Sequence, residues 1–225
     1  MSVKLISYST ATEELATDGL DDLQELIAFC AKVSNPTAQI NNETSERLLN
    51  YLVKHQHWSP FEMVSACLEI ETTRDIAHQI VRHRSFSFQE FSQRYANPAE
   101  MGDMFVLREA RLQDTKNRQN SVEVDSEEDI HYAWATEQQK VIDAASEAYN
   151  WAIKNGIAKE QARAVLPEGN TKTRLYMNGT IRSWIHYIDL RGANGTQKEH
   201  MDIAEACKNV FMEQFPTVAE ALEWN

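Results

Sequence analysis

The densest group of chemically capable side chains lies between Arg82 and Tyr95, in the run RHRSFSFQEFSQRY. Residues 82 to 94 contain three arginines, one histidine, three serines and a single glutamate. Guanidinium groups bind phosphates and carboxylates through paired hydrogen bonds, and serine hydroxyls supply further donors. Three cations this close in sequence repel one another unless an anion joins them. Phe86, Phe88 and Phe91 alternate with the polar residues, which favours a partly enclosed anion site over surface arginines paired with acids.

Two other polar clusters accompany this run. In HQHWSPFE, residues 55–62, Pro60 fixes a turn that can present Ser59 and Glu62 to a ligand. In GTIRSWIHYIDLRG, residues 179–192, Arg182 and His186 are four apart and share one face of an expected helix. From spacing alone, the favoured interpretation is that this pair is ordinary charge on a helix surface and not a functional site.

Metal and thiol chemistry receive less support. His55, His57, His78 and His83 are the ligands that a metal-dependent nucleotide phosphohydrolase, our alternative hypothesis, would use. However, His78 and His83 are five residues apart, and the chain has no HExxH, paired-Asp or CxxC pattern. The three cysteines, Cys30, Cys67 and Cys207, each lie among apolar neighbours, so we expect buried reduced thiols.

The elements that must position these residues follow from hydrophobic periodicity. Helices are predicted at 21–33, 43–55, 73–81, 127–155, 159–166, 180–190 and 197–214, and strands at 3–8, 63–72, 104–111 and 171–178. Ser126 and Asp129 suit an N-terminal capping box, and Gly156 a helix end. Val81 is expected to point inward. The polar stretch 112–129 is predicted to be a solvated loop without chemistry.

Length and composition agree with one α/β domain over residues 1–225, since no linker interrupts the alternating elements. The 22 basic and 34 acidic residues give a net charge of −12, which disfavours binding to DNA or RNA. No apolar run is long enough for a membrane span, and the N-terminus does not resemble a signal peptide. We therefore expect a cytoplasmic protein.

The ordered motifs resemble those of the flavin-dependent thymidylate synthases, the ThyX family. RHR followed by seven residues and Ser92 resembles the family signature, and Gln79 stands three residues before Arg82. HQHWSPFE, ARAVLP and GTIRSWIHYIDLR resemble three further family segments. The resemblance extends over roughly residues 20 to 215. This chain has Thr180, Gln89, Met63 and Gly195 where many relatives have Asn, Asn, His and His.

The resemblance implies conversion of dUMP to dTMP, with 5,10-methylenetetrahydrofolate as carbon donor and NADPH as reductant through FAD. It also implies an α/β fold with a central, mostly antiparallel sheet flanked by helices, assembled as a homotetramer whose active sites combine several subunits. A non-catalytic nucleotide-binding module that uses only the arginine cluster is a third hypothesis.

Residue roles carry over from the matching motif positions. The positions that match flavin-binding ones are His57, Ser59, Glu62, Arg82, His83, Arg84, Glu90, Thr180, Ile181, Arg182 and His186. The positions that match dUMP-binding ones are Gln79, Arg82, Glu90, Phe91, Ser92, Gln93, Arg94, Arg163 and Arg191. Arg191 matches the catalytic arginine that favours ionisation of uracil N3, and a cation there would stabilise charge on the activated ring. Ser92 has no matched base and is assigned to binding.

Overall fold

An antiparallel sheet forms where apolar and polar residues alternate along the chain. The computed structural model describes residues 1–20, 22–125 and 129–224. Its four-stranded sheet has the order β1 (Ser2–Tyr8), β2 (Ser65–Thr73), β6 (Lys172–Thr180) and β3 (Phe86–Glu90), and every neighbouring pair is antiparallel. In the central pair, Leu68 lies opposite Met177 and Ile70 opposite Leu175, and all four side chains are buried. Because successive side chains of a strand point to opposite faces, the alternation of apolar and polar residues places one face of β2 and β6 against the core.

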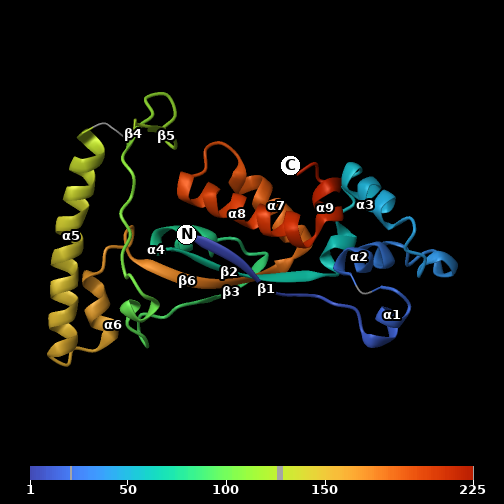
Figure 1. Ribbon diagram of the computed structural model, residues 1–225, viewed down its shortest axis with the longest axis horizontal. Helices are drawn as coiled ribbons and strands as arrows, with labels where there is room; N and C mark the ends of the chain where they lie inside the picture. The colour runs from blue at the N-terminus through green and yellow to red at the C-terminus, as the bar shows by residue number, and fades with distance from the viewer. Residues whose placement is uncertain (21, 126–128, 225) are drawn as a thin grey trace.

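Three C-terminal helices cover one face of the sheet (Figure 1). They are α7 (Ile181–Gly192), α8 (Lys198–Gln214) and α9 (Pro216–Ala221). Trp184 of α7 is fully buried, and its indole N–H donates to the Ala66 carbonyl at 3.0 Å. Helices α2 (Leu23–Ala31) and α3 (Ser45–Lys54) close one end of this core, and α4 (Arg74–Ile80) follows β2 directly.

A long helix stands at the opposite end of the sheet (Figure 1). It is α5 (Asp129–Lys154), which packs with the short α6 (Lys159–Ala162) through a second, smaller apolar cluster that includes Tyr149 and Leu166. Strands β4 (Arg111–Gln113) and β5 (Ser121–Glu123) form a hairpin beside α5 and α8. The remaining elements are α1 (Glu13–Thr17) and four 3-10 turns at Pro36–Ala38, Ser59–Glu62, Pro98–Met101 and Arg163–Val165.

The predicted mixed α/β fold with an antiparallel sheet is confirmed, but two segments are corrected. The predicted strand at 104–111 is wrong, because apart from one bridge between Phe105 and Thr171 its backbone does not join the sheet. Instead, the Arg108 N–H donates to the side chain of Gln138 at 2.8 Å. The stretch 112–129, predicted to be a loop, contributes most of the β4–β5 hairpin.

Smaller differences concern single residues and short elements. Val81 was expected to point inward but is 38% exposed, because the helix α4 ends at Ile80. Strand β3 and helices α1 and α9 were not predicted. The proposed cap residue Ser126 lies outside the described residues. Across the described ranges, no helix combines the length and apolar character that crossing a bilayer needs.

Candidate functional site

Helix α7 is the element on which the site is built. Its N-terminus is capped by Thr180, whose hydroxyl accepts from the Ser183 N–H at 3.2 Å. The apolar residues of the helix are buried against the sheet, whereas Arg182 and His186 face away from the core. The predicted shared face of Arg182 and His186 is therefore present, and the apolar side of the helix fixes its direction.

The turn at 57–62 packs against this exposed side of α7. Arg182 forms an ion pair with Glu62, with 2.6 Å between Nη1 and Oε1. The Trp58 and His186 rings meet edge to face with 5.1 Å between centroids. Ser59 begins a 3-10 turn with Pro60 in its first turn, as the sequence predicted, and His57 and Ser59 are exposed. Two predicted flavin-binding segments thus lie side by side.

The RHR turn joins the same helix at its other end. The Arg191 Nε–H donates to Nε2 of His83 at 2.9 Å. Burial lowers the pKa of His83, and the positive charge of Arg191 lowers it further. A ring nitrogen that accepts this bond carries no proton, so His83 is a neutral imidazole that holds a guanidinium in place. The Ser183 hydroxyl also donates to the Ser85 carbonyl at 3.4 Å.

Arg82 and Arg84 project from this turn without acidic partners. Both are exposed, and within the described part of the chain no carboxylate lies within 4.0 Å of either guanidinium. In a chain of net charge −12, unpaired guanidinium groups are a local excess of positive charge. They fit an anionic group such as a pyrophosphate better than they fit a surface salt-bridge network.

The other predicted residues lie at the far end of β3. Glu90 accepts from Arg74 at 3.1 Å and from Thr173 at 2.9 Å. Beyond it, Arg94 reaches the Glu160 carboxylate at 3.5 Å, while the Arg163 Nε–H donates to the Glu160 carbonyl at 3.3 Å. Two predicted nucleotide-binding arginines therefore meet at one residue, Glu160.

Gln93 is the most notable member of this second group. It is 3% exposed, and its Nε2 is a buried donor with no hydrogen-bond partner among the described residues. A buried donor without a partner costs free energy, so a ligand acceptor at this position would stabilise it. Phe91 and Ser92 are half-buried next to it, and the Ser92 hydroxyl accepts from the Arg94 N–H at 3.4 Å.

The structure does not bring every predicted group to one place. Ile181 is fully buried in the core, and its backbone N–H donates to the Val64 carbonyl at 3.0 Å, so neither group is available to a ligand. Gln79 is half-buried between His200 and Gln197, two residues that sequence reasoning missed because nothing in their spacing distinguishes them. The eleven-residue distance from Gln79 to Glu90 is spanned by the end of α4, the RHR turn and β3.

The four histidines of the alternative hypothesis do not converge. His55 and His57 have ring centroids 6.0 Å apart, whereas His78 lies 3.4 Å from Glu168 and His83 binds Arg191. In the described ranges there is no group of three or more His, Cys, Asp or Glu side chains that could hold a metal ion. The metal-dependent phosphohydrolase hypothesis is therefore not supported.

The cysteines are free thiols, as predicted, but only one is fully buried. Cys207 is 0% exposed, and burial raises the pKa of its thiol. Cys30 and Cys67 are half-buried instead of buried, because α2 and β2 turn those positions toward the edge of the core. Burial also raises the pKa of both, which disfavours the thiolate that nucleophilic chemistry needs.

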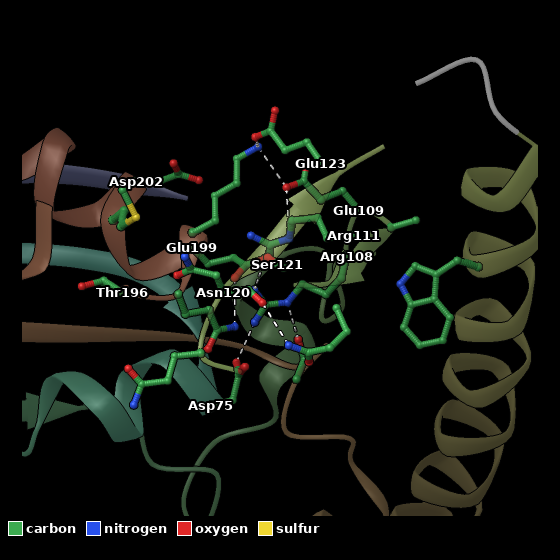
Figure 2. Close-up of a pocket in the computed structure, with 18 of the residues that line it drawn as sticks. Asp75, Arg108, Glu109, Arg111, Asn120, Ser121, Glu123, Thr196, Glu199 and Asp202 are labelled. Atoms are coloured by element: carbon green, nitrogen blue, oxygen red, sulfur yellow. Dashed lines mark hydrogen bonds and ion pairs between the residues drawn. The ribbon is translucent and has the colours of Figure 1, made fainter. Parts of the chain in front are cut away.

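A cavity of about 1030 Å³ lies away from these motifs, between the β4–β5 hairpin, α5 and the start of α8. Figure 2 shows Arg108 and Arg111 at its centre, facing Glu199. Arg108 lies 3.1 Å from Glu199 and 2.7 Å from Asp75, and Arg111 also pairs with Glu199. Its central charges are paired with one another, although the Nη1 atoms of Arg108 and Arg111 are buried without a hydrogen-bond partner among the described residues. We call this cavity the braced cleft.

Comparison with known proteins assigns these motifs to a family. A family model described as thymidylate synthase complementing protein matches residues 16–217. A probable flavin-dependent thymidylate synthase of Paramecium bursaria Chlorella virus 1 is 52% identical over 224 residues, covering 100% of both chains. A flavin-dependent thymidylate synthase of Synechocystis is 49% identical over 225 residues, again covering 100% of both. This chain belongs to the flavin-dependent thymidylate synthase family.

The fold agrees with that assignment. A UMP/dUMP methylase, PolB from Streptomyces cacaoi, bound with 5-Br dUMP, superposes with a TM-score of 0.81 at 25% identity, covering 99% of this chain and 94% of that one. The family, the enzyme class and the flavin dependence predicted from the motifs are confirmed for this flavin-dependent thymidylate synthase. The non-catalytic module hypothesis loses its basis for the same reason.

Proposed function

We propose that this chain converts dUMP to dTMP, with the carbon of 5,10-methylenetetrahydrofolate and with NADPH as reductant through FAD. The relatives' names and the 5-Br dUMP of the PolB structure support the substrate class. The observation that carries the proposal is a guanidinium, Arg191, oriented by neutral His83 beside the unpaired Arg82 and Arg84. This geometry suits a site that binds anions and stabilises new negative charge.

Arg191 is the residue that we assign to catalysis. Carbon 5 of uracil is a weak nucleophile until negative charge is allowed to develop on the N3 and O4 edge of the ring. A fixed cation at that edge stabilises the charge as it forms, without reorganising during the reaction. Because His83 accepts from Nε of Arg191, the outer nitrogens of the guanidinium stay available to the ring.

The group around Glu160 suits the phosphate of the nucleotide. Arg94 and Arg163 are cations that already lie close together through Glu160, and a phosphate can replace the carboxylate as the partner of Arg94. The unpartnered Nε2 of Gln93 supplies one more donor. Ser92 contacts no base, which supports a binding role instead of a nucleophilic one.

The flavin would be held by the residues of α7 and the two turns that pack on it. Arg82 and Arg84 match the pyrophosphate by charge, and Arg182 and His186 present polar groups from the exposed side of α7. FAD, when bound, supplies the hydride that the protein itself cannot. This explains how the fold manages without a reactive cysteine.

The arrangement supports a homotetramer with shared active sites. The Arg191 group and the Arg94 group lie beyond opposite ends of β3, whose five residues extend roughly 17 Å. One mononucleotide does not bridge both groups of the same chain, so a neighbouring copy would complete each site. A single catalytic domain over residues 1–225, a cytoplasmic location and no binding to nucleic acid are part of the same proposal.

The decisive experiment is an absorbance spectrum followed by a turnover assay. We expect purified protein to show oxidised-flavin absorbance that NADPH bleaches. Adding dUMP with methylenetetrahydrofolate should restore the absorbance and yield dTMP. Protein that carries flavin but forms no dTMP under these conditions would overturn the proposed reaction.

A further inference from the structure

A directed chain of hydrogen bonds runs through Gln79. The Tyr187 hydroxyl lies 3.1 Å from Nε2 of His200, and Nδ1 of His200 lies 3.3 Å from Oε1 of Gln79. The Gln79 Nε2–H donates to Oε1 of Gln197 at 2.8 Å, and the Gln197 Nε2–H donates to Oε2 of Glu199 at 2.9 Å. Tyr187, His200 and Glu199 are buried, so water does not compete for the Tyr187–His200 bond, whereas Gln79 is half-buried and Gln197 is exposed.

Tyr187 sets the direction at one end of the chain. Tyr187 is 1% exposed, and burial raises the pKa of its hydroxyl well above the ordinary value, so the hydroxyl keeps its proton. Among the residues that the structure describes, His200 is its one hydrogen-bond partner. Burial, together with the nearby Arg191 and His83, lowers the pKa of His200 to about 3, so the ring is neutral. The hydroxyl therefore donates to Nε2, and the ring proton sits on Nδ1.

Glu199 sets the same direction from the other end. Burial alone would raise the pKa of this carboxyl, but the hydrogen bond from Arg111 and the nearby Arg108 outweigh it and lower the pKa to about 2. An ionised carboxylate only accepts, so Gln197 must present its N–H₂ to Glu199 and its oxygen to Gln79. Both ends therefore require the same orientation of the Gln79 amide.

We propose that Tyr187 and His200 are positioning residues that lock the Gln79 amide with its oxygen turned away from the substrate and one N–H free for it. The other N–H of Nε2 is already used by Gln197. Gln79 then offers the nucleotide a donor and no acceptor. The inference rests on the proposed function, in which Gln79 contacts dUMP, and it explains how that contact would select a carbonyl oxygen of the pyrimidine.

Affinity for dUMP is the first test, measured by calorimetry on the flavin-loaded protein. Y187F keeps the aromatic ring and removes the hydroxyl that donates to His200, and H200L removes both nitrogens of the imidazole. We expect each to weaken dUMP binding roughly two- to tenfold, since the Gln79 amide then loses one of the two constraints on its orientation and is held only through Gln197. H200N, which keeps an N–H₂ near the place of Nδ1, should restore binding to near wild type. I203V, on the buried face of the same helix, is the packing control.

A double-mutant cycle separates positioning from general damage. In a Q79A background, H200L should cost no further affinity, because the group that His200 orients is gone. An equal loss from H200L with and without Gln79 would overturn the inference, and so would wild-type affinity in both Y187F and H200L.

The tautomer of His200 gives a readout that needs no substrate. Nitrogen NMR of the histidine side chains should show His200 neutral and protonated at Nδ1, and Y187F, which leaves only the Gln79 oxygen to select this tautomer, should weaken the preference. Protonation at Nε2 in the wild type would overturn the inference. If wild-type protein binds no dUMP while His200 shows the expected tautomer, the proposed function fails and the locked amide stands.

Discussion

Arg191 differs from Arg182 and Arg94 because its partner is a neutral imidazole and not a carboxylate. An ion pair would cancel much of its charge, whereas His83 orients the guanidinium and leaves the charge in place. His83 stays neutral because burial, then Arg191 itself, lowers its pKa. Pairing with His83 therefore leaves Arg191 as a cation that is available to a ligand beside the RHR turn.

Removing this cation should affect catalysis far more than cofactor binding. We expect R191A to lower kcat roughly 10²- to 10³-fold, the usual effect of losing one stabilising group of a transition state. Flavin absorbance should remain, since Arg82 and Arg84 are untouched. R191K keeps the charge but not the fixed geometry and should recover part of the rate. Steady-state kinetics with flavin content measured in parallel checks this, and unchanged kcat in R191A would remove the assignment.

Acid should destabilise the protein partly through His200. Its folded pKa, about 3, lies below the 6.5 of an unfolded histidine, so the unfolded chain binds the proton first. The contribution of His200 is complete above pH 6.5 and falls as the pH drops below it, by about 1.4 kcal/mol at pH 5.5. Glu199 follows only below pH 4.5, its ordinary pKa, and its contribution is lost toward pH 2.

Urea unfolding at pH 7.0 and 5.5 measures this effect directly. The wild type should lose about 1.4 kcal/mol more than H200N between the two pH values, because the variant has no ring to protonate. His83 titrates in both proteins and largely cancels in the difference. An identical loss in the two proteins would show that His200 is not held neutral by the fold.

At the scale of elements, β3 shows why part of the site was hidden in the sequence. Phe86 and Phe88 alternate with Ser87 and Gln89, which is both a strand pattern and the pattern of an enclosed polar site. From their chemistry, we interpreted these residues as an enclosed polar site and did not predict a strand. The structure shows that they also form a strand, because β3 pairs with β6 from Phe86 to Glu90.

In the segment 104–111 the error is the opposite one, because a strand was predicted there and the structure has none joined to the sheet. Its apolar residues suggest a strand, yet its backbone bonds go to Gln138 and to Asn170, the latter accepting the Val106 N–H at 2.9 Å. Strand propensity reports a fit to a half-buried surface and does not identify the partner. By contrast, the alternation in β2 and the apolar stripe of α7 were sufficient to predict a strand and a helix, because each element faces a single core.

The pairing of β3 with β6 depends on a glycine. Gly179 lies opposite Phe86, and a methyl group added there would run into the Phe86 ring. We expect G179A to lower stability by about 1–3 kcal/mol through overpacking and to displace the RHR turn that precedes β3. Thermal unfolding checks this, with G169A as the matched control, because nothing lies within 4 Å of a methyl at that position. Equal melting temperatures for the two variants would contradict the argument.

At the scale of the whole molecule, α5 exposes an apolar side that the single chain does not cover. Trp151 is 61% exposed and Val141 52% exposed. Trp151 also lines a shallow groove between α5 and α6, together with Ile157 and Val165. Exposed patches of this kind mark association surfaces, and the proposed sharing of active sites makes a second copy of this chain the expected occupant.

A charge placed in this groove should disperse the assembly. We expect W151E to shift the protein from the proposed tetramer toward smaller species and to reduce turnover with it. N150E, at the neighbouring exposed position of the same helix, adds the same charge and should leave the tetramer intact. Light scattering coupled to size-exclusion chromatography measures both. A fully tetrameric W151E would show that α5 is not an assembly surface.

Contacts between distant segments of the chain are what the sequence could least reveal. Four local motifs identified the family, since each is a run of residues with a recognisable chemical role. The buried partners of Gln79 and the braced cleft at Glu199 come from segments as distant as Arg111 and Glu199, 88 residues apart. Contacts of that range leave no local pattern in a single chain.

Glu199 gives the β4–β5 hairpin an influence beyond its own surroundings. One oxygen of this carboxylate pairs with Arg108 and Arg111, while the other accepts from Gln197, which in turn accepts from the Gln79 amide that we propose contacts the pyrimidine. Under that proposal, shortening the hairpin, which carries Arg111, would also alter the orientation of Gln79. We therefore expect a hairpin deletion to change base selection as well as stability.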